Sequence, residues 1–283
     1  MPTLHMLGTG TPSPARERWG TACALEFEHG VVMIDCGPAA TWKLTQAGLR
    51  PTDVSWLLVT HLHSDHFVDY PCLVLTRWDH CVGGEMPLMV MGPAPIREVT
   101  GKLFGPEGAF VDDLRARGEH IASKRVHLSR GGTLPRPRLQ MMVHDAVTGV
   151  MVGGREWSAR CAEVDHMQPY LTTLAWRIDW PGGSVVFSSD TRPCDALVEL
   201  AAGADLLVAN CPLRQGGLHD DLATCIFGTL DAAQVARDAA VGRMILTHLT
   251  GSLVRERDEA LAEIAEVFPG EVLIAEELMR VEL

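Results

Sequence analysis

The stretch Thr60-His61-Leu62-His63-Ser64-Asp65-His66 holds four potential metal ligands within six residues. It follows the apolar run 56–59, which has the length of a buried strand, so the ligands stand where a strand ends and a loop begins. The first two histidines alternate, and in an extended backbone alternate side chains point to the same side. Asp65 and His66 follow in the turn, where their side chains can face a second position next to the first. The spacing favours a site for two neighbouring cations over a loop that is rich in histidine by chance.

Three further candidate ligands stand in the same context later in the chain. His166, Asp190 and His248 each follow an apolar, strand-like run. Strands that finish at one edge of a sheet bring their terminal residues together, and loops on such an edge commonly carry sites. Imidazole and carboxylate ligands without thiolate suit catalytic Zn²⁺, with Mn²⁺ or Fe as alternatives. The joint pattern predicts two metal shells that share one aspartate.

The composition is that of an ordinary globular protein, with 47% hydrophobic and 21% charged residues among 283. The formal net charge of −12 repels polyphosphate partners unless a local basic patch offsets it. The densest basic patch runs from Lys124-Arg125 to Arg136-Pro137-Arg138. We expect this patch to be a solvated loop.

The eight cysteines are dispersed and form no Cys-x-x-Cys pair. The N-terminus has no basic segment followed by an apolar one, and no apolar run has the length of a bilayer span. These features predict reduced cysteines, no disulfide framework and a cytoplasmic, non-membrane protein.

The apolar pattern predicts alternating strands and helices in one domain, 1–283. Strands are expected at 3–7, 21–27, 31–35, 56–59, 87–91, 139–144, 156–163, 171–179, 184–188, 205–209, 243–247 and 272–275. Helices are expected at 39–48, 70–78, 95–104, 193–203, 231–240 and 253–267. The turn from Gly8 to Pro14 lacks the lysine of a phosphate-binding loop and predicts a close backbone approach. The irregular region 105–138 predicts a helical insertion or lid, and the two strand-rich halves predict two packed sheets with helices outside.

These motifs together resemble the metallo-β-lactamase superfamily, and specifically its ribonuclease Z-like branch of metal-dependent hydrolases. The resemblance covers nearly the whole chain. Besides the histidine-rich stretch, it rests on Leu7-Gly8-Thr9-Gly10, Val164-Asp165-His166, Ser189-Asp190-Thr191-Arg192-Pro193 and Leu246-Thr247-His248. It implies an α/β fold, a four-layer αβ/βα sandwich with metals at one edge of two sheets.

The resemblance also implies how the ligands divide between two metals. One metal would be held by His61, His63, His166 and Asp190. The other would be held by Asp65, His66, His248 and the same Asp190, which bridges. Two Zn²⁺ ions are the expected cofactors.

Two departures from the ribonuclease Z pattern bear on the substrate. That branch carries a further histidine, thought to donate a proton, and here its place near Gly228-Thr229 holds none, although His219 upstream could substitute. The branch often clamps tRNA with an arm inserted between the residues matching His166 and Asp190, where this chain has 23 residues, enough for two strands and a turn. With the acidic net charge, these departures predict a small-molecule substrate and no tRNA partner.

The leading hypothesis is a zinc-dependent dinuclear hydrolase of an ester, lactone, phosphodiester or activated aryl halide. Asp65 would orient the attacking water and accept its proton. The alternatives are a ribonuclease Z-like nuclease and a non-catalytic metal-binding regulatory protein, and a flavin-linked di-iron protein is a fourth. The oligomeric state stays open, with a homodimer among the options.

Residues outside the ligand set are expected to support or extend the site. Asp35 and Asp69 could fix imidazole tautomers. Substrate contacts are expected from the loops 67–82, 105–138 and 210–230. In the last of these, the expected contacts are Asn210, Arg214 and His219.

Overall fold

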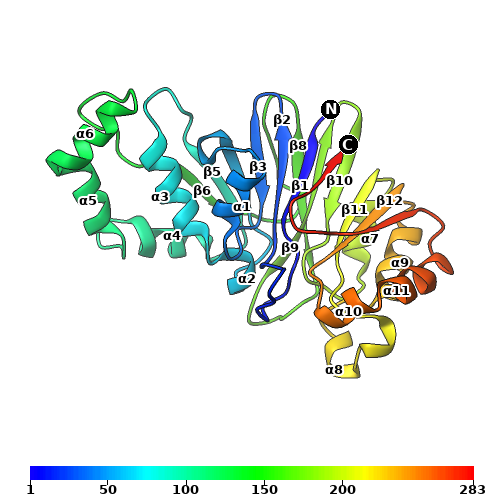
Figure 1. Cartoon of the computed structure of the whole chain (residues 1–283). Helices are drawn as coiled ribbons and strands as arrows, with labels where there is room; N and C mark the ends of the chain where they lie inside the picture. The colour runs from blue at the N-terminus through cyan, green and yellow to red at the C-terminus, as the bar shows by residue number, and fades with distance from the viewer.

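A computed structural model describes residues 1–283, in which two seven-stranded sheets lie face to face with helices outside them (Figure 1). The first sheet is antiparallel at the chain termini and parallel from β3 to β6. In spatial order its strands are β14 (Met279–Glu282), β1 (Thr3–Gly8), β2 (Ala22–Phe27), β3 (Gly30–Ile34), β4 (Val54–Leu58), β5 (Leu88–Gly92) and β6 (Met141–Asp145).

The second sheet is parallel from β13 to β10 and antiparallel from β10 to β7. In spatial order its strands are β13 (Glu271–Ile274), β12 (Arg243–Thr247), β11 (Leu206–Asn210), β10 (Gly183–Phe187), β9 (Thr173–Trp180), β8 (Ser158–Val164) and β7 (Met151–Gly153). Strands β8, β10, β11 and β12 run in the same direction, so their carboxyl ends lie at one edge.

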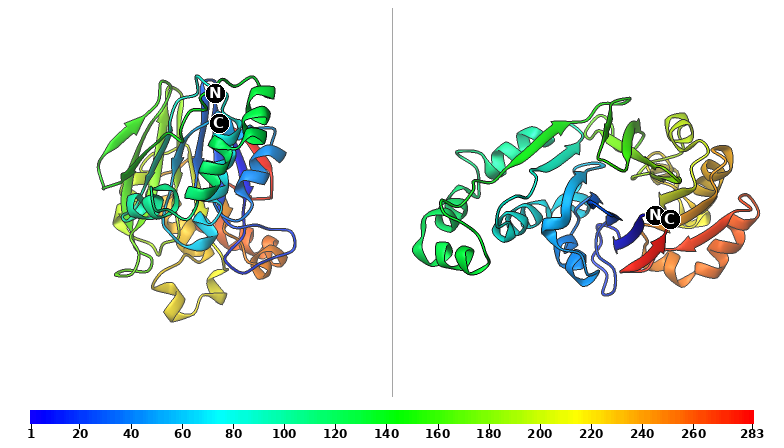
Figure 2. Two further views of the ribbon diagram at one scale, coloured as in Figure 1. Left: turned by 90° about the vertical axis from the view of Figure 1, so that its left-hand side faces the viewer. Right: turned by 90° about the horizontal axis from the view of Figure 1, so that it is seen from above.

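Helices cover the outer face of each sheet (Figure 2). Those in the first half of the chain are α1 (Ala40–Gln46), the 3₁₀ helix η1 (Pro51–Asp53), α2 (Ser64–Phe67), α3 (Tyr70–His80), α4 (Ile96–Phe104), α5 (Val111–Glu119) and α6 (Ile121–Ser129). Those in the second half are α7 (Asp195–Ala201), the 3₁₀ helix η2 (Gln215–Gly217), α8 (Asp220–Ala223), α9 (Thr229–Asp238), α10 (Gly251–Arg255) and α11 (Arg257–Ala265).

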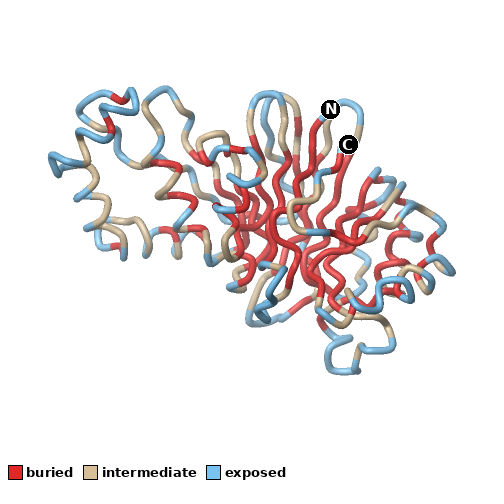
Figure 3. The backbone as a smooth tube through the Cα atoms, in the orientation of Figure 1, coloured by how far each residue is buried: buried red, intermediate tan, exposed pale blue.

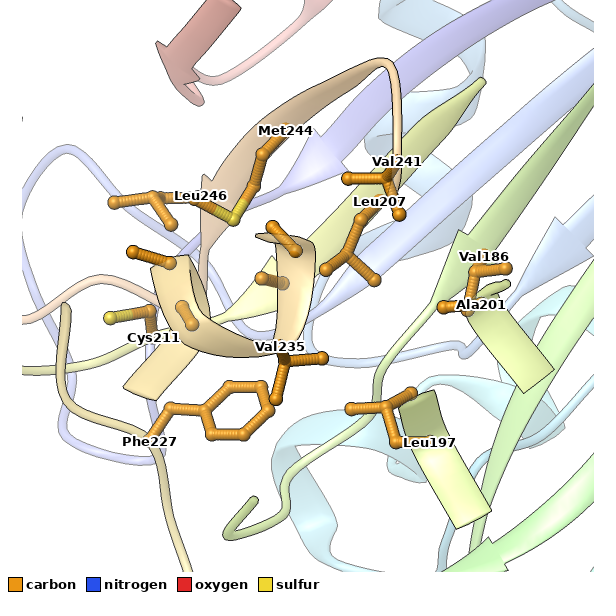
Figure 4. Close-up of a cluster of buried hydrophobic side chains, with 14 of the residues drawn as sticks. Val186, Leu197, Ala201, Leu207, Cys211, Phe227, Val235, Val241, Met244 and Leu246 are labelled. Atoms are coloured by element: carbon orange, nitrogen blue, oxygen red, sulfur yellow. The ribbon is translucent and has the colours of Figure 1, made fainter. Parts of the chain in front are cut away.

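Three apolar cores hold these four layers together, and buried residues concentrate in the sheets (Figure 3). The middle core lies between the two sheets and includes Leu58 from β4 and Trp176 from β9. A second core joins the first sheet to α1 and α3. The third joins the second sheet to α7, α9 and α11, with Phe227 fully buried beside α9 (Figure 4). Each such side chain contributes about 1.5–3 kcal/mol to folding.

The predicted αβ/βα sandwich is confirmed, with differences in its details. The helix expected at 253–267 is divided into α10 and α11 at Glu256. The short strands β7 and β14 are not anticipated from the sequence, and β14 exists because it pairs with β1 from the other end of the chain. A Cβ on Gly8 would overlap the carbonyl of Gly20, which confirms the close backbone approach.

Residues 105–138 contain α5 and α6, which pack on each other and project from the outer edge of the first sheet (Figures 1 and 2). No helix in the structure combines the length and apolar character required to cross a membrane.

Candidate metal centre

The histidine-rich loop is held between the two sheets by backbone contacts. The amide of Val59 donates to Met91 on β5, and its carbonyl accepts from the indole Nε1 of Trp176 on β9, at 2.7 and 3.1 Å. A Cβ on Gly37 would overlap the carbonyl of Asp65, so the chain needs glycine where it passes under the loop. These contacts fix the loop at the edge where the second sheet presents its strand ends.

The first group of ligand-type side chains comprises His61, His63, His166 and Asp190. Nδ1 of His63 lies 3.0 Å from Nε2 of His61 and 3.4 Å from Nε2 of His166. Oδ2 of Asp190 lies 4.0 and 3.9 Å from the same two Nε2 atoms. One ligand atom from each residue therefore faces a common point, and all four atoms lie within 4.8 Å of one another.

The second group comprises Asp65, His66 and His248. Oδ2 of Asp65 lies 3.1 Å from Nε2 of His248 and 3.6 Å from Nε2 of His66. Asp190 reaches this group too, with Oδ1 3.7 Å from Nε2 of His66 and Oδ2 3.4 Å from Nε2 of His248. The carboxylate of Asp190 thus lies between the two groups.

Buried partners orient several of these side chains from behind. Asp35 follows β3, and its Oδ2 lies 2.7 Å from Nδ1 of His66 while its two oxygens accept from the amide and hydroxyl of Thr60. The amide of Asn210 donates to Oδ1 of Asp190 at 2.7 Å. Nδ1 of His166 lies 2.7 Å from the carbonyl of Cys225. A carbonyl can only accept, so Nδ1 of His166 carries the proton and Nε2 is free to bind a cation.

Three residues of the site have left-handed backbone conformations although none is glycine. Their φ angles are +61° at Asp35, +63° at Ser189 and +59° at His248. Such conformations are uncommon for these residues and cluster at functional sites. Each occurs just after a strand, where it turns the chain sharply. The sequence carries no signal of this strain, because none of the three positions holds the glycine that usually marks a left-handed conformation.

The electrostatics of the site keep Asp190 ionised and place positive charge beside it. Burial lowers the pKa of His61 well below its usual value, and the neighbouring His66 adds to the effect. Burial opposes ionisation of Asp190, but His248 and His66 outweigh it and hold its pKa well below the usual range. Burial also disfavours charge on His66, yet Asp35 and Asp190 raise its pKa well above normal. Positive charge is therefore stabilised between the carboxylates.

The donor set fits divalent cations. Nε2 of His66 is buried, has no hydrogen-bond partner and faces the carboxylates of Asp65 and Asp190. A buried polar atom without a partner is costly unless a ligand engages it. All seven side chains offer nitrogen or oxygen and none offers sulfur, which matches catalytic zinc and related metals.

The remaining predicted residues lie in different environments. Arg214 pairs with Glu256 and Glu263 at 3.1 Å each. His219 is exposed at the start of α8. Asp69 accepts from the amide of Thr41 near the start of α1 and makes no side-chain hydrogen bond or ion pair with a predicted ligand. Of the two acids expected to support the site, Asp35 therefore contacts a predicted ligand, while Asp69 fixes a helix.

The amino-terminal part of the chain, residues 2–80, matches the family model of the anti-Pycsar protein Apyc1. Over its whole length the chain is similar to ribonuclease Z of Mycobacterium sp. strain KMS, at 30% identity over 293 residues, covering 99% of this chain and 95% of the relative. The chain belongs to the ribonuclease Z family. This family is one of hydrolases with the metallo-β-lactamase fold, so the predicted resemblance is confirmed.

Solved structures agree with this family at the level of the fold. The metallo-β-lactamase fold protein YhfI from Bacillus subtilis superimposes with a TM-score of 0.76 at 21% identity, covering 100% of both chains. The short form of human tRNase Z superimposes with a TM-score of 0.71 at 19% identity, covering 99% of this chain and 98% of that one.

These relatives overturn one prediction. The expectation of a small-molecule substrate without a tRNA partner is wrong, because the relatives that align with the whole chain at 30% identity are ribonucleases Z. The structure does show β9 and β10 filling the space between His166 and Asp190, so no arm is inserted there. The error lies in the conclusion: one missing arm and a net charge summed over the whole chain do not describe the local surfaces that an RNA meets.

Proposed function

We propose that this chain is a metal-dependent phosphodiesterase that cleaves RNA, with tRNA precursors as its substrate class. One observation carries the proposal. Seven ligand-type side chains from two sheets converge in two adjacent groups, within a chain that aligns with ribonucleases Z from end to end. Phosphodiester hydrolysis by paired metals uses such a site, in which two cations stabilise the attacking and leaving oxygens.

Two Zn²⁺ ions are the proposed cofactors, and Mn²⁺ or Fe are compatible with the same donors. The first group would hold one ion through Nε2 of His61, Nδ1 of His63 and Nε2 of His166, and the second group the other through Asp65, His66 and His248. Asp190 would contribute to both. When bound, such cations supply Lewis acidity and make water nucleophilic near neutral pH.

Residues of the chain itself would orient the attacking water and accept its proton. Burial disfavours the charge on Asp65, but the hydrogen bond from His248 and the nearby His66 lower its pKa, so Asp65 is a carboxylate at neutral pH. Its Oδ2 faces His248, and the carboxylate can accept a proton from the attacking water as a general base. Asp35, itself held by Thr60, fixes the imidazole of His66, and Asn210 fixes the carboxylate of Asp190.

The leaving-group side of the site departs from the family pattern. Phe227 is fully buried in the third core, Gly228 is the N-cap residue before α9, and the hydroxyl of Thr229 donates to Glu263. None of the three side chains is an acid available to a leaving oxygen. His219, exposed at the start of α8, stays our proposal for a substrate contact in this loop.

The decisive experiment is cleavage of a labelled tRNA precursor by the protein loaded with Zn²⁺ or Mn²⁺. We expect 3′ processing that stops with a chelator and resumes on adding metal. Hydrolysis of bis(p-nitrophenyl) phosphate serves as a parallel measure of the metal centre. If the loaded protein hydrolysed this diester but left tRNA precursors and other RNA intact, the RNA substrate would be excluded.

A further inference from the structure

We infer that residues 115–138, the basic insert, form a docking surface for the phosphate backbone of the RNA substrate. The inference rests on the proposed function and adds a binding surface separate from the metal centre. The basic insert consists of the end of α5, the helix α6 and the segment leading to β6. It projects from the outer edge of the first sheet, and most of its residues are exposed or intermediate in burial (Figures 1 and 3).

The charge of the chain is strongly segregated. The basic insert holds seven of the 24 lysines and arginines but one of the 36 acidic residues, so its net charge is +6 while the rest of the chain carries −18. A polyanion is repelled by most of this surface and attracted to the insert. Such asymmetry steers charged partners toward one face. The proposed function requires a polyanionic substrate, and the insert is the part of the chain with matching charge.

The insert is anchored to the end of α3 by Trp78 and Asp79. Three arginines surround the single carboxylate of Asp79: Arg117 at 3.3 Å, Arg130 at 2.7 Å and Arg136 at 2.9 Å. The Arg136 guanidinium also lies 4.1 Å from the ring centroid of Trp78 and is 3% exposed, which corrects the expectation of a solvated loop. Arg117 also pairs with Asp113 at 2.8 Å. Two carboxylates therefore face three guanidinium groups, and the anchored cluster keeps an excess of one positive charge.

Arg115 pairs with Glu119 at 3.9 Å, but three other basic side chains of the insert have no acidic partner. Lys124 and Arg125 on α6 and Arg138 before β6 form no ion pair, and Arg125 and Arg138 are exposed. Arg138 also lines a cavity of about 160 Å³ with the backbone of Gly83 and Gly84. Helix α6 buries only His127. Unpaired, exposed cations on an anchored helix can replace the counterions of phosphates without first breaking internal pairs.

The alternative occupant of this surface is a second copy of the chain. Helix α6 also exposes Ile121, Val126 and Leu128, side chains that a protein partner could cover. A second copy would bring another +6 insert or the acidic remainder of the chain. Charge favours RNA, because every phosphate of an RNA is complementary to the insert. RNA binding and self-association at this surface would give different results in measurements of tRNA affinity and of oligomeric state.

The test is equilibrium binding of mature tRNA to the metal-loaded protein over a series of salt concentrations. The charge-reversal variant K124E/R125E should bind at least about ten-fold more weakly at low salt, and the slope of log K against log salt should fall by roughly two. The neutral variant K124Q/R125Q guards against effects of reversal on folding and should show an intermediate loss. Hydrolysis of bis(p-nitrophenyl) phosphate should stay at the wild-type rate in both.

The matched control is R155E, which reverses an exposed, unpaired arginine on the loop between β7 and β8. It should change tRNA affinity less than two-fold. Affinity and salt slope in K124E/R125E equal to those of R155E would overturn the docking surface, even if the wild type cleaves tRNA precursors. A wild type that neither binds nor cleaves RNA would overturn the proposed function as well. Loss of a dimer in sedimentation with unchanged tRNA affinity would assign the surface to a second copy.

Discussion

The carboxylate of Asp35 lies 2.7 Å from Nδ1 of His66, and both side chains are buried. Asp35 also accepts two hydrogen bonds from Thr60, the first residue of the histidine-rich stretch. The end of β3 therefore fixes both the backbone at the start of the loop and the imidazole at its end.

Replacing Asp35 by asparagine should weaken metal binding about 10- to 100-fold, the usual effect of losing a group that orients a ligand. The measurement is competition with a chromogenic chelator. D69N is the matched control, because Asp69 accepts from Thr41 and contacts no predicted ligand. Equal metal affinities for the two variants would contradict the role of Asp35.

Replacing Asp65 by alanine should abolish phosphodiester hydrolysis while the fold survives. We expect a loss of kcat of about 10²–10⁴-fold or more, because the change removes both a general base and a proposed ligand. The rate of bis(p-nitrophenyl) phosphate hydrolysis measures the loss of activity, and the circular dichroism spectrum checks that the fold survives. D220A, at an exposed acid on α8, should keep the wild-type rate. Retained turnover in D65A would place the proton acceptor elsewhere.

Metal stoichiometry should distinguish a shared carboxylate from two independent sites. We expect two equivalents of metal per wild-type chain, about one in H248A and close to none in D190A, because Asp190 faces both groups. Elemental analysis after dialysis gives the counts. D190A retaining one full equivalent would show that Asp190 serves a single ion.

Truncating Phe227 to alanine should destabilise the protein by about 3–5 kcal/mol, since it leaves a cavity in a closely packed core. Urea unfolding measures the change. F227L fills more of the space and should cost less. Similar stabilities for the wild type and F227A would show that the core drawn in Figure 4 does not depend on the Phe227 ring.

The stability of the contact between the basic insert and α3 should depend on pH, because it involves the carboxylate of Asp79. Burial opposes its charge, but Arg130 and Arg136 prevail and hold the Asp79 pKa well below its usual range. A depressed pKa means that the stabilisation is complete above the unfolded carboxyl pKa of about 3.9 and is lost as the pH falls toward the folded value. Protease sensitivity of residues 105–138 should therefore rise below about pH 4 in the wild type.

In D79N the same protease sensitivity should be high at neutral pH and change little on acidification. Equal protection of the wild type and D79N at pH 7 would show that the arginines do not depend on this carboxylate.

The ligand residues could be predicted because each follows an apolar strand, a pattern that local sequence records. The sequence does not predict which of Asp35 and Asp69 supports a metal ligand. That depends on the pairing of β3 with β4, which brings Asp35 beside Thr60. Arg136 illustrates the same limit: its burial comes from Trp78 and Asp79, about 57 residues earlier in the chain. Net charge predicts the wrong substrate class here because it is a sum over the whole chain, whereas binding depends on where the charges lie.

Each ligand group draws side chains from both sheets: His61 and His63 with His166 and Asp190, and Asp65 and His66 with His248. Neither half of the chain can assemble a complete group alone. A cation bound at either group would therefore cross-link the two halves of the chain. It could bind with its full set of ligands only after the two halves have packed together. The metal content of a preparation would then report the fraction of correctly assembled molecules. Removing the metal with a chelator should weaken the interface between the two sheets before either sheet unfolds.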